Sequence, residues 1–280
     1  MQTAINIKDK IVYLVLILLG IFTILYQINF EDLWLDEMTS FWIADPKLSY
    51  SETINRQKYT DWHNPILFNI ILKNFLNLVG YNPDLARYLP SLFGSLSFFM
   101  IGLITFQEKK DNTFLLSTFF ACSSIYLIKY SQELRPYSLL FFSSALNIFF
   151  YIKMLRVSGK KNIHVFLFIL FSVINYSVNP FSLIIYFSQI TYLIYRFLFF
   201  REKQKSYLIA LILIIFFYLL FNYNYILYQI TFDNYMLSND IRNVIDGLYF
   251  PRFFGSKIMG YFYLFLLISL IFKSRKSFFD

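Results

Sequence analysis

The feature that most constrains this chain is a series of apolar runs, each long enough to cross most of a lipid bilayer. About 20 helical residues span the roughly 30 Å of hydrocarbon, at about 1.5 Å per residue. Candidate spans lie near residues 11–28, 89–106, 113–128, 137–152, 163–178, 181–198, 207–228 and 258–272. With 58% hydrophobic and 15% charged residues, the chain has too little polar surface to cover a soluble domain. We therefore predict an all-α, polytopic integral membrane protein with about eight transmembrane helices.

The basic residues predict the orientation of these spans. Most of the 25 Lys and Arg residues fall in short clusters, such as Lys8 with Lys10, in segments that are cytoplasmic if both termini are cytoplasmic. This distribution predicts a multi-pass protein of the cell membrane. The run 11–28 has no small-residue cleavage site after it, so we expect a retained span. No basic stripe occurs on a polar segment, which argues against nucleic acid as a partner despite the net charge of +8.

Two sizeable segments, residues 29–88 and 229–257, are then extracytoplasmic. In the first, apolar residues from Ile66 to Leu76 fall at helical spacing, which predicts an amphipathic helix lying along the membrane interface. The second contains several Asp and Asn residues and either shapes an acceptor site or forms a solvated loop. The single cysteine, Cys122, excludes intrachain disulfides, and no Cys/His cluster typical of a metal site occurs.

Four polar groups are predicted at this outer face: Asp36-Glu37, Asp61 to Pro65, Arg87 to Gly94, and Tyr130 to Tyr137. Each has a structural explanation. Asp36 suits the N-cap of a short surface helix, His63 suits a hydrogen-bonded structural role, and Arg87 and Arg135 suit interfacial anchors. Because successive helix residues point about 100° apart, Asp36 and Glu37 cannot both face one substrate atom.

An acid and an arginine at a membrane face also suit attack on a phosphate-linked donor. A carboxylate takes a proton from an acceptor hydroxyl, while a guanidinium binds the departing phosphate through two parallel hydrogen bonds. A polyprenyl chain on that phosphate would keep the donor in the bilayer. Such a donor would explain a catalyst built from apolar helices.

These segments resemble the GT-C class of membrane glycosyltransferases, especially the protein O-mannosyltransferases (dolichyl-phosphate-mannose-protein mannosyltransferase-like) and the lipid A aminoarabinose transferases. Trp34 to Glu37 resembles the Asp-Glu signature of the first outer loop. His63 to Leu67 resembles His-Pro-Pro-Leu, with Asn64 in place of the first proline. Arg87 to Gly94 resembles Arg-x-x-Pro-Ser-x-x-Gly. Ser131 to Leu139 resembles Ser-Gln-Glu-Ala-Arg-Pro-Tyr-Ser-Leu, with Leu134 replacing alanine.

The resemblance covers residues 1 to about 200 of what we predict to be one catalytic module over residues 1–280. It implies an inverting hexosyl- or pentosyltransferase that moves sugar from a polyprenyl-phosphate donor to a hydroxyl of a glycan, lipid or protein on the extracytoplasmic side. The implied catalytic residues are Asp36, as the base, and Glu37. The implied donor phosphate-binding residues are Arg135, Arg87 and Lys129, and the site-organising residues are His63, Glu133 and Tyr137. A divalent metal ion is the one cofactor implied, with Glu37 and His63 as candidate ligands.

Two other functions fit the sequence. One is a transporter or flippase of lipid-linked sugars, which would favour polar or broken helices near the middle of the membrane. The predicted spans show few such features, and their charges gather at the outer surface. The other is a non-catalytic subunit that keeps the shape of the module. Members of the class are usually longer than this chain, so three readings stay open: a compact member, a fragment, or a subunit whose partner supplies the rest. The sequence also leaves the sugar, the acceptor and the oligomeric state open.

Overall fold

The computed structural model describes residues 7–61, 64–109, 113–156, 161–200 and 205–221, together with Tyr223, Tyr261 and Phe265. The chain divides into two compact units, Met1–Ile226 and Leu227–Asp280, and the helices below belong to the first. All secondary structure in the described residues is helical, which confirms the predicted all-α class. The predicted outer loop 229–257 lies outside the described residues, as does the predicted span 258–272 apart from Tyr261 and Phe265.

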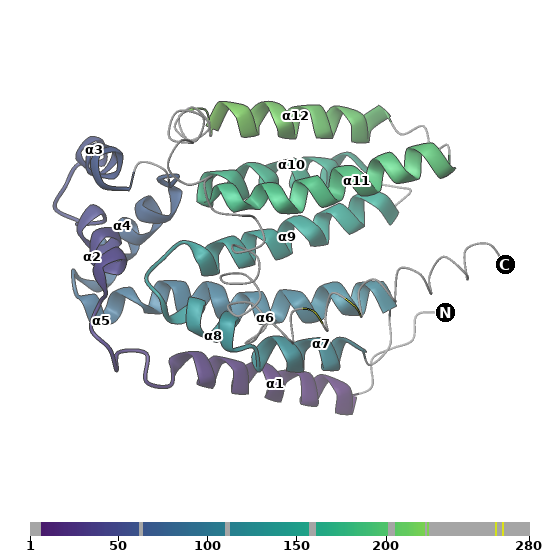
Figure 1. Ribbon diagram of the computed structural model, residues 1–280. Helices are drawn as coiled ribbons and strands as arrows, with labels where there is room; N and C mark the ends of the chain where they lie inside the picture. The colour runs from purple at the N-terminus through teal and green to yellow at the C-terminus, as the bar shows by residue number, and fades with distance from the viewer. Residues whose placement is uncertain are drawn as a thin grey trace. The chain divides into compact units, whose positions relative to one another are not determined.

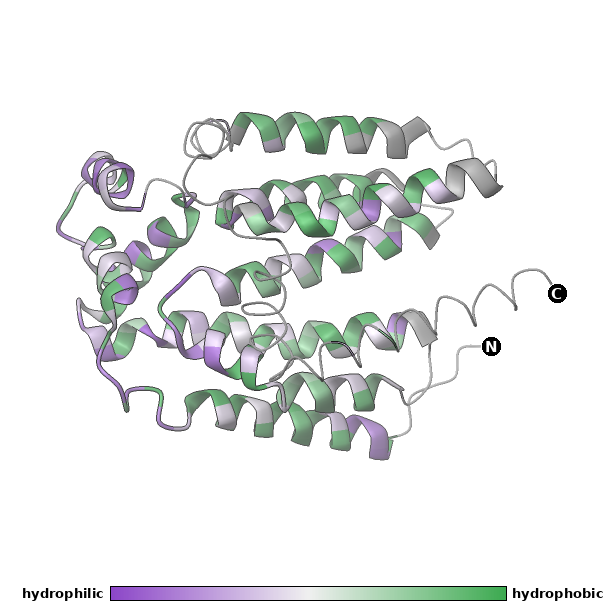
Figure 2. Cartoon of the chain, viewed as in Figure 1, coloured by the Kyte–Doolittle hydropathy of each residue, from purple (hydrophilic) through white to green (hydrophobic). Residues whose placement is uncertain are grey.

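The first unit contains a bundle of long helices that run parallel or antiparallel to one another (Figure 1). They are α1 (Ile7–Leu25), α6 (Tyr88–Lys109), α9 (Tyr137–Arg156), α10 (Lys161–Val178), α11 (Leu183–Phe200) and α12 (Lys205–Phe221). Helix α9 packs against both α6 and α10, and α10 packs against α12. Two shorter helices, α7 (Thr113–Cys122) and α8 (Ile125–Gln132), pack against α1 and α6. Apolar residues predominate along these helices (Figure 2).

Among the described residues, two helical stretches are long and apolar enough to cross a membrane: Pro83–Gln107 and Tyr137–Leu155. Helices α7 and α8 make a third if the pair is one span, but they meet at an angle of 53°. The predicted span 113–128 therefore consists of two helices that meet at a bend. The reason is local, because the Ser124 hydroxyl accepts a hydrogen bond from the Leu127 N–H (3.4 Å) and starts a new helix.

The other predicted spans correspond to helices that are shorter or more highly charged. Helix α1 has 19 residues, but its first turn includes Lys8, Asp9 and Lys10. Helices α10 and α11 have 18 residues each and α12 has 17. The described helices thus support two or three membrane crossings by length and composition alone.

Four short helices gather at one end of the bundle (Figure 1). They are α2 (Leu35–Ile43), α3 (Tyr50–Thr60), α4 (Leu67–Val79) and α5 (Pro83–Ala86). Helix α3 begins with a capping box, in which the Glu52 N–H donates to the Ser49 hydroxyl (3.2 Å) and the Ser49 N–H donates to the Glu52 carboxylate (2.7 Å). The buried Lys73 ammonium of α4 donates to the carbonyls of Asp45 (2.7 Å) and Leu48 (2.6 Å). This lysine fixes the loop that joins α2 to α3.

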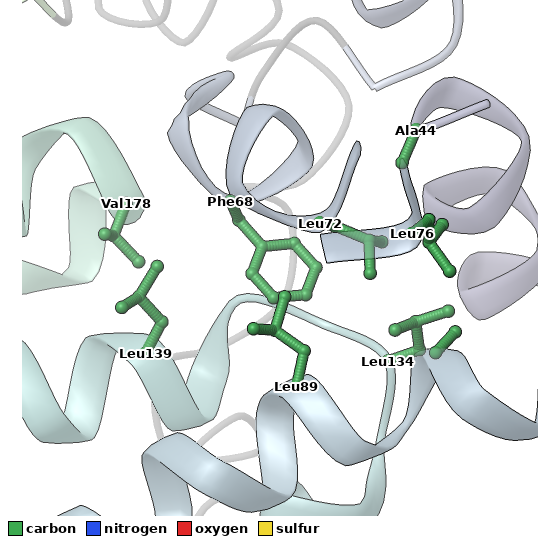
Figure 3. Close-up of a cluster of buried hydrophobic side chains, with 9 residues drawn as sticks. Ala44, Phe68, Leu72, Leu76, Leu89, Leu134, Leu139 and Val178 are labelled. Carbon is green, nitrogen blue, oxygen red and sulfur yellow. The ribbon is translucent and has the colours of Figure 1, made fainter. Parts of the chain in front are cut away.

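Helix α4 fastens the short helices to the bundle through a buried apolar cluster (Figure 3). Its members are Ala44, Phe68, Leu72, Leu76, Ala86, Leu89, Leu134, Leu139 and Val178. The predicted amphipathic helix is therefore confirmed, and its apolar face packs against protein. An amphipathic pattern specifies that a face is covered, and it does not identify what covers it.

Candidate functional site

The adjacent acids Asp36 and Glu37 point in different directions from the first turn of α2. The helix begins at Leu35 with Trp34 in the N-cap position, so the prediction that Asp36 is the N-cap is wrong. Glu37, at the third helical position, accepts a hydrogen bond from the Trp34 N–H (3.3 Å). The Asp36 side chain is 48% exposed and the Glu37 side chain only 1%. The expectation that the two acids cannot face one atom is confirmed.

Glu37 forms a buried two-point ion pair with Arg87. Arg87 Nη2 donates to Glu37 Oε2 (2.6 Å), and Arg87 Nε donates to Glu37 Oε1 (3.1 Å). The Leu134 N–H also donates to Glu37 Oε1 (2.6 Å). One carboxylate thus ties together α2, the start of α6 and the link between α8 and α9, which carries Arg135.

Arg87 has an acceptor for each of its five N–H groups. Besides Glu37, these are the backbone carbonyls of Ile28 (3.0 Å), Glu31 (2.6 Å) and Asp32 (3.2 Å), all in the segment that follows α1. The arrangement leaves no Arg87 N–H group to bind a phosphate. Arg87 therefore holds the approach to α2 in place.

Arg135, by contrast, is buried and makes long hydrogen bonds. Its Nη1 donates to the Asp36 carbonyl (3.3 Å), the Ser40 hydroxyl (3.4 Å) and Asp61 Oδ2 (3.4 Å). Its Nη2 lies 3.9 Å from Asp36 Oδ2. Arg135 Nε is buried and has no hydrogen-bond partner among the described residues. A buried donor without an acceptor is costly, so this guanidinium retains capacity for a further anion.

Asp61, at the C-terminal end of α3, is the residue that sequence analysis missed. Its Oδ1 accepts from Asn64 Nδ2 (2.7 Å), and its carbonyl accepts from Gln57 Nε2 (2.7 Å). These amides hold the carboxylate against Arg135, and the Asp61 side chain is only 9% exposed. The segment Asp61 to Pro65 was singled out from the sequence, but for His63, which lies outside the described residues. The available signal was that Asp61 lies in one of the four polar segments predicted at the outer face, two of which contain Arg87 and Arg135.

Of the remaining predicted residues, Lys129 lies on α8, Glu133 lies in the link that follows, and Tyr137 begins α9. The Lys129 side chain is 68% exposed, and its Nζ lies 3.9 Å from Glu133 Oε1. Burial raises the pKa of the Glu133 carboxyl above its ordinary value, and the Lys129 charge opposes this shift. The half-buried Tyr137 ring meets the Tyr130 ring edge-on at 5.0 Å, and the Tyr137 side chain lies beside the Arg135 guanidinium.

Two of the predicted polar segments, Arg87 to Gly94 and Tyr130 to Tyr137, pack directly against each other. The Ser91 hydroxyl of α6 donates to the Ser131 carbonyl of α8 (3.1 Å). A Cβ atom added to Gly94 would collide with the Ser131 side chain. Glycine is thus needed at this position because α8 approaches the α6 backbone closely. The contact brings the link with Arg135 next to the start of α6.

The described residues do not fit the implied metal role of Glu37. Both of its carboxylate oxygens already accept hydrogen bonds, so a cation there would have to displace Arg87. No group of three or more His, Cys, Asp or Glu side chains is placed to hold a metal ion within the part of the chain that the structure describes. We derive no step through a metal ion.

A second polar cluster lies inside the bundle, on α9, α10 and α11. Asn147 Nδ2 donates to the Ser172 hydroxyl (2.8 Å), and Gln189 Nε2 donates to Asn147 Oδ1 (2.7 Å). Asn175 pairs in the same way with the hydroxyls of Ser143 and Ser144. These side chains are all buried, and their hydrogen bonds connect three helices. The sequence-based view that the predicted spans have few polar features needs correction here.

Comparisons with protein-family models, with curated proteins and with solved structures found no match to this chain.

Proposed function

We propose that this chain is a membrane-embedded glycosyltransferase that uses a polyprenyl-phosphate sugar as donor and acts on the extracytoplasmic side. The observation that carries the proposal is that two side chains from distant segments meet. One is the exposed carboxylate of Asp36, and the other is the guanidinium of Arg135, whose buried Nε has no hydrogen-bond partner among the described residues. Arg135 and Asp36 are 99 positions apart in the chain, and their side chains approach to 3.9 Å. The sequence resemblance assigns Asp36 to the acceptor and Arg135 to the donor phosphate.

The membrane part of the proposal is supported by the outward faces of the helices. Leu14, Leu18 and Phe22 are exposed on α1, and Ile184 and Phe187 are exposed on α11. Apolar side chains at such positions suit contact with lipid and do not suit contact with water. We infer about eight crossings, both termini in the cytoplasm, and the charged end of the bundle at the outer surface, as the distribution of basic residues predicts.

In the proposed reaction, Asp36 accepts the proton of the acceptor hydroxyl while that oxygen attacks the anomeric carbon of the sugar. The bond from this carbon to the phosphate oxygen breaks, its electron pair leaves with the phosphate, and the anomeric configuration inverts. Arg135 stabilises the departing phosphate through charge-assisted hydrogen bonds. Glu37 and Arg87 do not touch the donor in this scheme, and they position the two residues that do.

The test is transfer of a labelled sugar from a polyprenyl-phosphate donor in membranes that contain the chain. Asp36→Asn should lower the rate about 10²- to 10⁴-fold, since it removes a general base. Arg135→Ala should have a loss of the same order. Asp32→Asn and Arg56→Lys are matched controls, because the proposed reaction assigns neither residue to the donor or to the acceptor. The Asp32 side chain is exposed, and Arg56 lies on α3 against the Trp42 ring. Wild-type rates in both Asp36→Asn and Arg135→Ala would contradict the assignment.

A second candidate, a transporter or flippase of lipid-linked sugars, is supported by the buried amides inside the bundle and by the 53° bend between α7 and α8. Polar and broken helices near the middle of the membrane are typical of transporters. This function predicts movement of labelled donor across sealed vesicles in the absence of any acceptor. Transfer to an acceptor without such movement would favour the glycosyltransferase.

A further inference from the structure

The charges around Arg135 are unequal, and this inequality bears on which phosphate the site prefers. Two carboxylates face the one guanidinium, since Oδ2 of Asp61 lies 3.4 Å from Nη1 and Oδ2 of Asp36 lies 3.9 Å from Nη2. The other charges nearby form their own pairs, Glu37 with Arg87 and Glu133 with Lys129. Counted over the described residues, the Arg135 guanidinium and the two carboxylates therefore carry a formal charge of about −1 when both Asp36 and Asp61 are ionised.

Hydrogen bonds hold Asp61 in this position beside Arg135. Asn64 holds its second carboxylate oxygen, and Gln57 holds its carbonyl. Gln57 in turn pairs with Asn69 of α4, the helix that anchors the short helices to the bundle. The negative charge of Asp61 is thus built into the scaffold beside Arg135.

The proposed reaction changes the charge of the phosphate that Arg135 contacts. A phosphodiester donor carries a single negative charge. When the bond between the sugar carbon and the phosphate oxygen breaks, its electron pair stays on the phosphate, and the acceptor proton goes to Asp36. The product is a phosphomonoester, which carries a charge near −2 above its second pKa of about 6. After Asp36 returns its proton to solvent, the product faces two carboxylates and one guanidinium.

We propose that Asp61 makes the Arg135 site discriminate between phosphates by charge, so that it binds the phosphodiester donor and expels the phosphomonoester product. The inference rests on the proposed function and adds a specificity-determining role for Asp61. Without its charge, the site should hold the product more tightly, because one repulsive interaction at short range is lost.

The experiment measures binding by the full chain in lipid nanodiscs at pH 8, with two probes: decaprenyl phosphate as the monoester and decaprenyl methyl phosphate as the diester. The wild-type protein should bind the diester about tenfold more tightly than the monoester. Asp61→Asn should bind the monoester about tenfold more tightly than wild type does, and the affinity for the diester should change by less than about threefold. In turnover, the same variant should show stronger product inhibition with little change in KM for the donor.

Two further variants separate charge from shape. Asp61→Glu keeps the charge and should keep the wild-type preference, while Asp84→Asn removes an exposed acid of α5 and should change neither affinity. Equal affinity of the wild-type protein for both probes would overturn the inference even if Asp61→Asn does not fold. A monoester affinity that Asp61→Asn leaves unchanged would also overturn it. Absence of sugar transfer with the preference intact would instead contradict the proposed function.

Discussion

The charged end of the bundle and the amide cluster inside it bury polar groups in opposite ways. At the end, Glu37, Arg87, Asp61 and Arg135 place full charges among short helices, where backbone groups of several segments stabilise them. Inside, Asn147 and Gln189 use neutral amides between long helices. A charge in an apolar bundle costs more than an amide, which accounts for full charges at the end of the bundle and neutral groups between the long helices.

The charged end itself contains two arginines with different roles. Arg87 has short hydrogen bonds to a carboxylate and three carbonyls, whereas Arg135 has long hydrogen bonds and a buried Nε without a partner among the described residues. A saturated guanidinium stabilises the fold, and an unsaturated one can bind a ligand. Burial alone does not distinguish the two, since both residues are 7% exposed.

The largest expected stability effect is at the pair of Glu37 and Arg87. Arg87→Met should destabilise the protein by about 3–5 kcal/mol, because it leaves the Glu37 charge buried without its partner. The double variant Glu37→Gln with Arg87→Met should be less destabilised than Arg87→Met alone, since no buried charge remains. Thermal unfolding in detergent measures both. A cost below about 0.5 kcal/mol, the range expected of a surface position, would show that the pair is not structural.

The amide cluster should give a smaller stability effect and no specific loss of transfer. Asn147→Leu leaves the Ser172 hydroxyl and Gln189 amide without this partner, which should cost about 1–2 kcal/mol. Sugar transfer per folded molecule should stay within about twofold of wild type. Selective loss of transfer with unchanged stability would show that the amide cluster takes part in function, and it would favour the second candidate function, transport of lipid-linked sugars.

The smallest expected effect is at Glu133. Its pKa is raised by burial in the folded protein, so at pH values above this pKa the ionised carboxylate opposes folding, and at low pH the protonated form does not. Glu133→Gln should therefore be more stable than wild type at pH 8, by less than about 1 kcal/mol, and equally stable near pH 4. Unfolding curves at the two pH values check the sign. A variant less stable than wild type at pH 8 would show that the Lys129 pair outweighs the burial.

The sequence predicted which segments form the site better than it predicted the contacts within it. Asp36, Arg87 and Arg135 were expected on one face, and the structure brings their segments together. The pairing of Glu37 with Arg87 could not be predicted, because the acid-acid spacing shows that two side chains diverge but not which one is buried. Asp61 was passed over since its importance depends on Arg135, 74 positions away.

For the helices too, the sequence predicted features that depend on local pattern better than features that depend on single residues or on contacts between helices. Hydropathy located the long helices, with ends that differ by a few residues from the predicted spans. It did not reveal the bend at Ser124, where a single serine hydroxyl caps a new helix inside an apolar run. Nor did it reveal that Ser143 and Asn147 of α9 belong to the buried amide cluster, because isolated polar residues hardly change the average of a window.

The most direct test of the central claim is a double-mutant cycle on Asp36 and Arg135, with sugar transfer from a polyprenyl-phosphate donor as the readout. If the two side chains act on one donor head group, Asp36→Asn and Arg135→Ala should each remove most of the rate, and the double variant should lose little more than either single variant. Losses that multiply independently, or full activity in both single variants, would contradict the account.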